Sequence, residues 1–196
     1  MKPRQASRTR NTRETRIRID LNIDGGGRYE IDTGLPFFNH MLELLAKHSL
    51  LDLKLKATGD LAVDYHHTVE DVGLALGEAL NEALGDRKGI ERYGFSLMPM
   101  DETLSRVALD LGGRPYLVLD MANKKRKILD FELSLLGEFL RAFTTQARMN
   151  LHICQLYGSD AHHAWESVFK GLARALKMAC KRDPRVKGVP SSKGIL

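Results

Sequence analysis

The 196-residue sequence contains little cysteine, with Cys154 and Cys180 as its only two, and a single tryptophan. Two cysteines that are not spaced as Cys-x-x-Cys do not form a disulfide framework or a redox motif, so we expect reduced thiols in a cytoplasmic protein. No apolar run approaches the ~18 residues that a membrane-spanning helix needs. Residues 1–18 are charged and lack an apolar stretch, and we therefore do not expect a secretory signal.

Acidic residues are the minority among the charged side chains, because 25 Asp and Glu stand against 30 Lys and Arg, a formal net charge of +5. Much of the excess lies near the two ends of the chain, and such a surplus favours anionic partners. The sequence shows no interleaving of basic and aromatic residues, no RNP motif and no zinc-finger spacing. A nucleic-acid-binding module is one interpretation of the charge, and a small phosphorylated substrate is the other.

Two histidines followed by a glutamate occur twice in the chain, as His66-His67-x-x-Glu70 and as His162-His163-x-x-Glu166. Residues 66–80 and 162–176 are identical at seven of fifteen positions, and both copies continue into an apolar pattern of helical period. The chain therefore looks like an internal duplication with the same polar cluster in each half. A single copy would be typical of an ordinary polar helix start, but two copies at one offset favour a metal site.

The spacing within each copy indicates two ions rather than one. On a helix, residues three or four positions apart share a face, so Glu70 can help either His66 or His67. Adjacent residues point about 100° apart, so the two histidines are poorly placed to bind the same ion. Imidazole and carboxylate donors without a thiolate suit Mn, Fe, Zn or Ni.

The duplication extends beyond the paired motifs. Leu53 and Leu151 align within equivalent apolar strands, and this alignment places His40 opposite Glu138. Eight candidate ligands then divide into two four-ligand sites that each borrow from both halves: His40, His66, His67, Glu70, Glu138, His162, His163 and Glu166. A dinuclear metallohydrolase is an alternative, although such sites usually contain more carboxylates. A structural metal site that only holds an oligomer together is another.

Hydrophobic periodicity predicts an α+β fold of two similar halves, residues 1–88 and 89–196, in one compact domain. Each half is expected to contain a mostly antiparallel sheet and two helices, with the sheets stacked on each other between the helix layers. Strands are predicted over 15–23, 28–33, 51–57, 93–98, 103–111, 116–121 and 150–157, the first two as a hairpin around three glycines. Helices are predicted over 36–48, 66–84, 133–149 and 162–181.

Several motifs resemble the imidazoleglycerol-phosphate dehydratase family over essentially the full length of the chain. The most specific are Asp64-Tyr65-His66-His67-Thr68-Val69-Glu70-Asp71 and His162-His163-Ala164-Trp165-Glu166. Shorter matching tracts cover residues 10–15, 37–42, 89–94, 100–102, 112–115, 151–153 and 190–194. Asn39 and Leu44 depart from the Asp and Gln that the family usually has.

The resemblance implies two Mn²⁺ ions per chain, a ribosomal protein S5 domain 2-like fold, and a homo-oligomer of 24 chains with active sites at subunit interfaces. By this resemblance, one ion is held by His40, His67, His162 and Glu166. The other ion is held by His66, Glu70, Glu138 and His163.

The reaction that the resemblance implies is a step of L-histidine biosynthesis, in which D-erythro-imidazole glycerol phosphate loses water and becomes imidazole acetol phosphate. No carbonyl lies next to the carbon that loses its proton, so the substrate's imidazole is the only electron sink, and two metals could favour its imidazolate form. The resemblance assigns acid–base catalysis to Glu14. It assigns substrate binding to Glu14, His48, Arg92, Arg114, Lys170, Ser192 and Lys193, and neither nucleic acid nor a membrane is expected as a partner.

Overall fold

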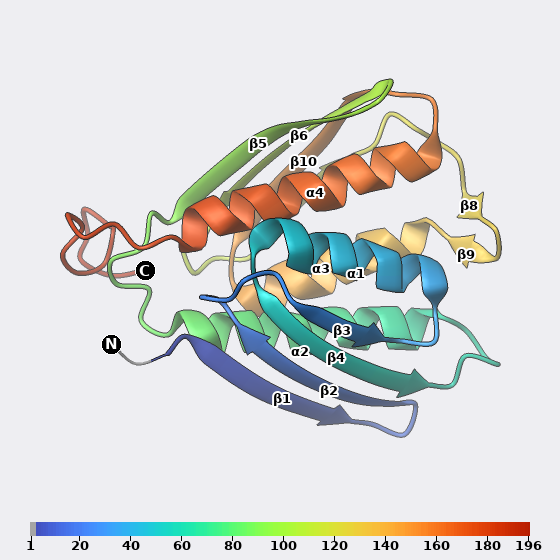
Figure 1. Ribbon diagram of the computed structural model, residues 1–196, viewed down its shortest axis with the longest axis horizontal. Coiled ribbons are helices and arrows are strands. Elements are labelled where there is room, and N and C mark those ends of the chain that lie inside the picture. Colours follow the sequence, from blue (N-terminus) through green and yellow to red (C-terminus); the bar gives the residue numbers. More distant parts are fainter. Residues whose placement is uncertain (1–2) are drawn as a thin grey trace.

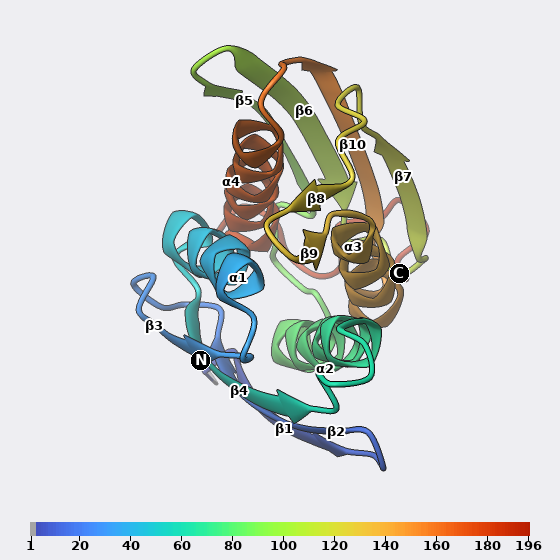
Figure 2. The same cartoon turned by 90° about the vertical axis from the view of Figure 1, so that its right-hand side faces the viewer.

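Two four-stranded sheets form the outer layers of the molecule, and four helices lie between them (Figure 1, Figure 2). The structure, a computed structural model, describes residues 3–196. The first half contains β1 (Gln5–Asn11), β2 (Thr15–Asn22), β3 (Tyr29–Asp32), α1 (Pro36–Ser49), β4 (Asp52–Gly59) and α2 (His66–Leu84). The second half contains β5 (Tyr93–Met100), β6 (Thr103–Asp110), β7 (Tyr116–Asp120), β8 (Lys127–Ile128), β9 (Phe131–Glu132), α3 (Ser134–Ala147), β10 (Asn150–Tyr157) and α4 (Ala161–Cys180).

The two large sheets have the same topology, with strand orders β1-β2-β4-β3 and β5-β6-β10-β7. In each sheet, two antiparallel pairings are followed by one parallel pairing at the edge. The registers also correspond, because Asn22 lies opposite Asp52 in the first sheet and Asp110 lies opposite Asn150 at the equivalent place in the second. The α+β class and the duplication into two similar halves are therefore confirmed.

The helices pack in pairs through the middle of the molecule, α2 against α3 and α1 against α4 (Figure 2). The predicted layer order is wrong, because the sheets lie outside the helices and are not stacked on each other. The physical reason is that the helices are apolar on more than one face. Helix α4 buries 14 of its 20 residues, whereas a helix in an outer layer would bury a single stripe.

The contact between α2 and α3 is close because glycine occupies the crossing. A Cβ atom on Gly77 would lie 2.7 Å from the carbonyl oxygen of Phe143 and 2.9 Å from the amide nitrogen of Ala147. The equivalent position of α4 is Ala173, which is fully buried. The α2–α3 contact therefore leaves no room for a side chain at this point, whereas the equivalent position of α4 holds a methyl group.

The predicted hairpin around the three glycines is also wrong. Strand β3 pairs with β4 in parallel, with Tyr29 opposite Leu53, and it is not a neighbour of β2. The carboxylate of Asp52 accepts hydrogen bonds from the backbone N–H groups of Gly26 (2.8 Å) and Arg28 (3.0 Å). These bonds hold the glycine loop against the first residue of β4. The chain therefore crosses from β2 to the other side of β4 before β3 begins.

Strand β1 was not predicted because two of its three inward positions, Arg8 and Arg10, are basic, and only Ala6 is apolar. Arg10 Nε lies 2.8 Å from the carboxylate of Asp71, and Arg8 forms an ion pair with Glu82, both on α2. The short strands β8 and β9 were also missed, because two-residue strands have no measurable periodicity. The other predicted strands and helices are confirmed to within two residues at either end. Among residues 3–196, no helix is long and apolar enough to cross a membrane.

Candidate metal centre and active site

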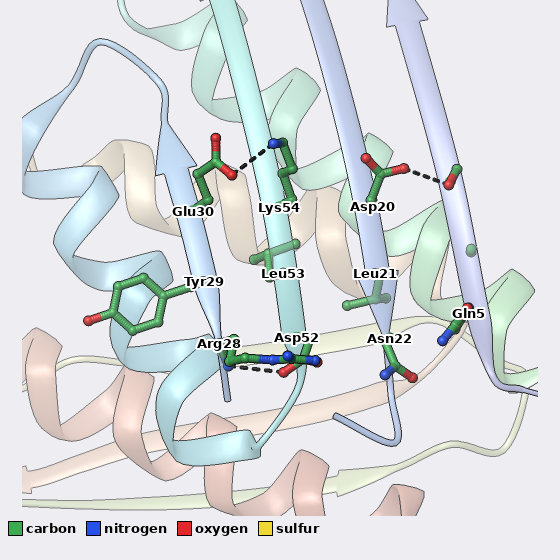
Figure 3. A pocket seen from close by; sticks show the side chains of 12 residues that line it. Gln5, Asp20, Leu21, Asn22, Arg28, Tyr29, Glu30, Asp52, Leu53 and Lys54 are labelled. Carbon is green, nitrogen blue, oxygen red and sulfur yellow. Dashed lines mark hydrogen bonds and ion pairs between the residues drawn. The ribbon is translucent and has the colours of Figure 1, made fainter. Parts of the chain in front are cut away.

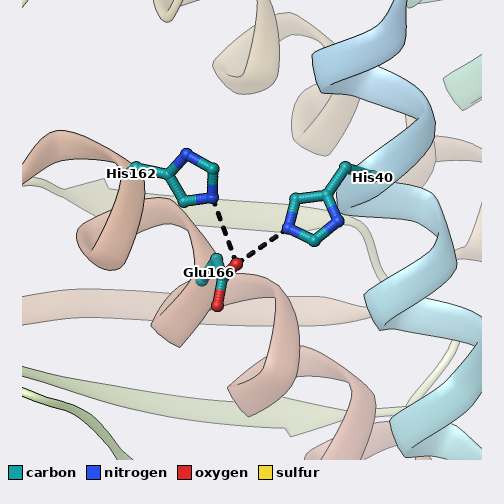
Figure 4. A group of neighbouring side chains, drawn as sticks. All are labelled: His40, His162 and Glu166. Carbon is teal, nitrogen blue, oxygen red and sulfur yellow. Dashed lines mark hydrogen bonds and ion pairs between the residues drawn. The ribbon is translucent and has the colours of Figure 1, made fainter.

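Three candidate ligands from both halves of the chain meet at one place (Figure 4). His40 comes from α1, whereas His162 and Glu166 come from successive turns of α4. The Nε2 atoms of His40 and His162 lie 2.7 and 3.1 Å from Oε1 of Glu166. One donor atom from each residue lies within 4.8 Å of the others, and no second group of three His, Cys, Asp or Glu side chains within residues 3–196 converges in this way.

The start of α4 is set by Asp160, which caps the helix. Its carboxylate accepts hydrogen bonds from the backbone N–H groups of His162 (2.7 Å) and His163 (3.0 Å). Both histidines therefore lie in the first turn, and Glu166 follows His162 by four positions on the same face.

Glu166 joins the cluster, and only 8% of it is exposed. Burial alone would raise the pKa of its carboxyl group, but hydrogen bonds from Lys170, His40 and His162 outweigh burial and lower the pKa to about 2. Lys170 Nζ donates to Oε2 at 2.5 Å, which leaves Oε1 to the two imidazoles. The carboxylate is therefore anionic at neutral pH, which is the form that binds a metal ion.

The equivalent residues of the other helix pair are less closely grouped. His66 and Glu70, one turn apart on α2, have Nε2 and Oε2 3.3 Å apart. Glu138 on α3 is the repeat counterpart of His40, but its carboxylate lies 3.5 Å from Nε of Arg141. These three side chains do not all lie within 4.8 Å of one another. Two of them are carboxylates, which repel each other when both are charged.

The second histidine of each pair faces a carboxylate of its own half. His67 Nδ1 lies 3.1 Å from Asp60 and 3.8 Å from Glu14, and His163 Nδ1 lies 2.8 Å from Glu102. Hydrogen bonds to Asp60 and Glu102 raise the pKa of these two imidazoles. One chain thus brings together three of the four ligands in the first predicted set and two in the second.

Sequence reasoning did not identify Asp60 and Glu102 as the carboxylates that contact His67 and His163. Asp60 lies before the start of α2, and Glu102 lies far from His163 in the sequence, so helical periodicity identifies neither of them. The only available sign for Glu102 was its place in the Met100-Asp101-Glu102 tract that matches the family pattern. Contact with the histidines depends on the turns that the tertiary fold places beside α2 and α4.

Two of the predicted substrate-binding residues lie near the His40 cluster. Lys170 contacts Glu166 directly, one helical turn further along α4. His48 is in the last turn of α1, where burial and the charges of Lys170 and Arg174 lower the pKa of its imidazole. Glu14 lies beside His67 instead, and half of its side chain is exposed.

The remaining predicted substrate-binding residues lie at the opposite end of α4: Arg92, Arg114, Ser192 and Lys193. The backbone N–H of Arg92 donates to the carbonyl of Ala179, in the last turn of α4. Its guanidinium donates to the carbonyl oxygen of Pro190 at 2.8 Å, at the start of the segment that carries Ser192 and Lys193. From His162 to Ala179 the helix spans roughly 25 Å, so one chain does not bring these residues to the His40 cluster.

A surface depression of about 490 Å³ lies on the outer face of the first sheet (Figure 3). Its charged side chains have partners within the depression, Glu30 with Lys54 at 2.8 Å, Arg28 with Asp52 at 2.7 Å, and Asp20 with the hydroxyl of Ser7 at 2.6 Å. It contains none of the predicted ligands or substrate-binding residues. We therefore do not assign this depression to the active site.

The duplicated fold and the mixed cluster define an α+β protein that offers imidazole and carboxylate donors from both of its halves at one point. A family model described as imidazoleglycerol-phosphate dehydratase matches residues 33–176. Imidazoleglycerol-phosphate dehydratase from Azorhizobium caulinodans is 54% identical over 98% of both chains. The protein of the same name from Pelobacter propionicus is 52% identical, over 98% of this chain and 99% of that relative.

Two solved structures are similar as well. Imidazoleglycerol-phosphate dehydratase from Staphylococcus aureus superposes with a TM-score of 0.83 at 38% identity, covering 91% of this chain and 99% of that one. The structure of IGPD from Pyrococcus furiosus in complex with (S)-C348 gives a TM-score of 0.83 at 39% identity, covering 96% and 100%. This chain belongs to the imidazoleglycerol-phosphate dehydratase family, and it is a lyase of histidine biosynthesis.

Proposed function

We propose that this chain dehydrates D-erythro-imidazole glycerol phosphate to imidazole acetol phosphate and uses two Mn²⁺ ions per chain. The observation that carries the proposal is the convergence of His40, His162 and Glu166 from two halves, with donor atoms within 4.8 Å of one another. Two imidazole nitrogens and an anionic carboxylate oxygen fit Mn²⁺, which takes nitrogen and oxygen donors. Thiolate, which favours softer ions, is not among these donors.

On this proposal, the two predicted ligand sets are completed across chains. His67 and His163 each use Nδ1 for a carboxylate of their own half, which leaves Nε2 for another partner. The first ion would be held by His40, His162 and Glu166 with a neighbouring chain's copy of His67. The second would be held by His66, Glu70 and Glu138 with a neighbouring chain's copy of His163.

When bound, the ions would act as Lewis acids on the imidazole of the substrate, which must accept electrons as the carbon loses its proton. Glu14 is proposed as the acid–base group. Its carboxylate lies in the turn between β1 and β2, half exposed and 3.8 Å from Nδ1 of His67, beyond hydrogen-bonding reach. It is therefore accessible for proton transfer to and from a substrate. The proposed phosphate-binding groups are Arg92, Arg114, Lys170, Ser192 and Lys193.

A homo-oligomer, expected to contain 24 chains, is part of the proposal. The roughly 25 Å between the His40 cluster and the Arg92 end of α4 supports active sites that are shared between chains. The outer faces of the two sheets give further support. Strand β5 exposes Tyr93, Phe95 and Leu97, whereas the first sheet exposes charged residues such as Arg18 and Lys56. An exposed apolar row is typical of a protein interface.

Neither nucleic acid nor a membrane is expected as a partner, and we infer a cytoplasmic location. The free thiols of Cys154 and Cys180 support this location, because extracellular compartments favour disulfides.

The test is a dehydration assay on protein that has been stripped of metal with a chelator, with and without added Mn²⁺. We expect activity only with the metal, and the same result for Glu30→Gln, an exposed carboxylate on the outer face of the first sheet. Folded and assembled protein that is inactive with every divalent ion would contradict the proposal. Full activity without metal would do so too.

The alternatives predict different results in the same preparations. A dinuclear metallohydrolase would release inorganic phosphate from the substrate rather than water. A nucleic-acid-binding module would bind nucleic acid with a steep salt dependence and would be indifferent to the chelator. A purely structural metal would keep its spectrum unchanged when the substrate is added.

A further inference from the structure

Two carboxylates occupy equivalent turns in the two halves of the molecule. Glu14 directly precedes Thr15, the first residue of β2, and Glu102 directly precedes Thr103, the first residue of β6. The matching registers of the two sheets make these positions repeat counterparts. Both turns lie on the same side of the molecule in Figure 1, where the paired histidines begin α2 and α4.

The histidine beside Glu14 already has another partner. Nδ1 of His67 donates to the carboxylate of Asp60, with the two oxygens at 3.1 and 3.2 Å. Glu14 stays at 3.8 Å from the same nitrogen, with 51% of its side chain exposed. Asp60 directly follows the last residue of β4. Because Asp60 accepts the hydrogen bond from His67, Glu14 does not bind this histidine.

The second half has no counterpart of Asp60. A register shift between Gln155 and Tyr157 brings Gly158 against Thr103, as Gly59 lies opposite Thr15 in the first sheet. The residue that follows Gly158 is Ser159, so the position equivalent to Asp60 has no carboxylate. Glu102 takes Nδ1 of His163, at 2.8 Å.

The carboxylate of Glu102 is itself held in place by other groups. Its Oε1 accepts hydrogen bonds from the backbone N–H of Asp160 and from Oγ1 of Thr103, both at 2.9 Å. Its Oε2 is left for His163. The orientation of this carboxylate therefore depends on the backbone of the loop before α4.

We propose that Glu102 is a positioning residue that fixes His163 in the Nδ1–H tautomer and so leaves Nε2 free to bind a metal ion. The two equivalent glutamates therefore have different roles. In the first half Asp60 orients His67, which leaves Glu14 available for proton transfer, whereas in the second half Glu102 itself orients His163. A carboxylate that accepts the Nδ1–H of a ligating histidine sets both its tautomer and its ring orientation. The inference rests on the proposed function only in requiring that the paired histidines bind metal.

The test compares Glu102→Gln with its repeat counterpart Glu14→Gln. A glutamine at position 102 can turn its NH₂ group toward Nδ1 of His163 and favour the tautomer whose Nε2 carries the proton. We expect this variant to bind one of two Mn²⁺ ions about 10–100-fold more weakly, measured as bound Mn²⁺ per chain and by the Mn²⁺ paramagnetic resonance signal. Glu14→Gln should lose activity and keep both ions. The side chain of Glu102 is 39% exposed in a turn, so folding should be retained.

Unchanged Mn²⁺ affinity in Glu102→Gln, with wild-type protein binding two ions, would overturn the inference and leave the proposed function standing. Wild-type protein that binds no Mn²⁺ would overturn both. A second variant, Glu102→Asp, keeps a carboxylate on the same turn and should bind Mn²⁺ more tightly than Glu102→Gln. Equal affinities for these two variants would also contradict the positioning role.

Discussion

The two helix pairs are repeats of one another, yet they arrange their candidate ligands differently. Where α1 crosses α4, His40 can donate a hydrogen bond to the anionic carboxylate of Glu166, and three donors converge. Where α2 packs on α3, the counterpart of His40 is Glu138, whose carboxylate lies 3.5 Å from Nε of Arg141. The first site thus offers two imidazoles and one carboxylate, whereas the second offers one imidazole and two carboxylates, which repel each other when both are charged.

The proposed two-site arrangement is tested most directly at His67 and His163, which one chain does not bring to the other ligands of their predicted sets. We expect His67→Ala to lower kcat/KM by about 10³-fold, because an electrostatic stabiliser of the reaction would be lost. Assembly should also weaken, since the same ion would join two chains. Steady-state kinetics and sedimentation velocity measure the two effects. A fully active and fully assembled variant would remove His67 from the ligand set.

The outer faces of the two sheets offer a second comparison. Phe95→Asp places a charge in the exposed apolar row of β5, and we expect it to dissociate the oligomer, because burying an unpaired charge is costly. Lys56→Asp, on the outer face of β4, should leave the assembly intact. Sedimentation velocity at equal protein concentration distinguishes them, and dissociation by both variants would argue against the second sheet as the specific interface.

The crossing points of the helix pairs can be compared by opposite substitutions. Gly77→Ala should destabilise the protein by on the order of 1 kcal/mol, because overpacking against Phe143 outweighs the gain in helix propensity. The converse change at the equivalent position, Ala173→Gly, should cost about 1 kcal/mol through lost helix propensity. Denaturant unfolding of assembled protein provides the measurement. A stabilised Gly77→Ala variant would show that α2 and α3 can move apart at no cost.

The smallest effect is the pH dependence of stability that Glu166 contributes, which is confined to acid pH. The folded pKa of about 2 lies below the ordinary value of 4.5, so ionised Glu166 stabilises the native state above the unfolded pKa. This stability is lost as the pH falls from about 4.5 toward 2. In metal-free protein, unfolding free energies should depend less on pH in this window for Glu166→Gln than for wild type, and identical slopes would contradict the assignment.

Much of the local structure was predictable from the sequence because it depends on periodicity. The four helices and most strands follow from apolar spacing, and the paired motifs begin α2 and α4 as expected. Strand β1 was not predictable, since its inward arginines became compatible with a sheet only through Asp71 and Glu82 on α2. The pairing of β3 with β4 likewise depends on Asp52, which lies far along the chain from the loop it holds.

The sequence by itself determined the duplication, the α+β class and the types of donor atom available. Only the tertiary structure decided that the helices lie between the sheets, that His40, His162 and Glu166 converge, and that Arg92 lies at the far end of α4. It also decided that Glu102 is engaged by His163 while Glu14 is not held by His67. The physical reason is that periodicity and side-chain chemistry act over a few residues. Layer order and ligand convergence depend instead on which groups distant in sequence satisfy one another's hydrogen bonds and charges.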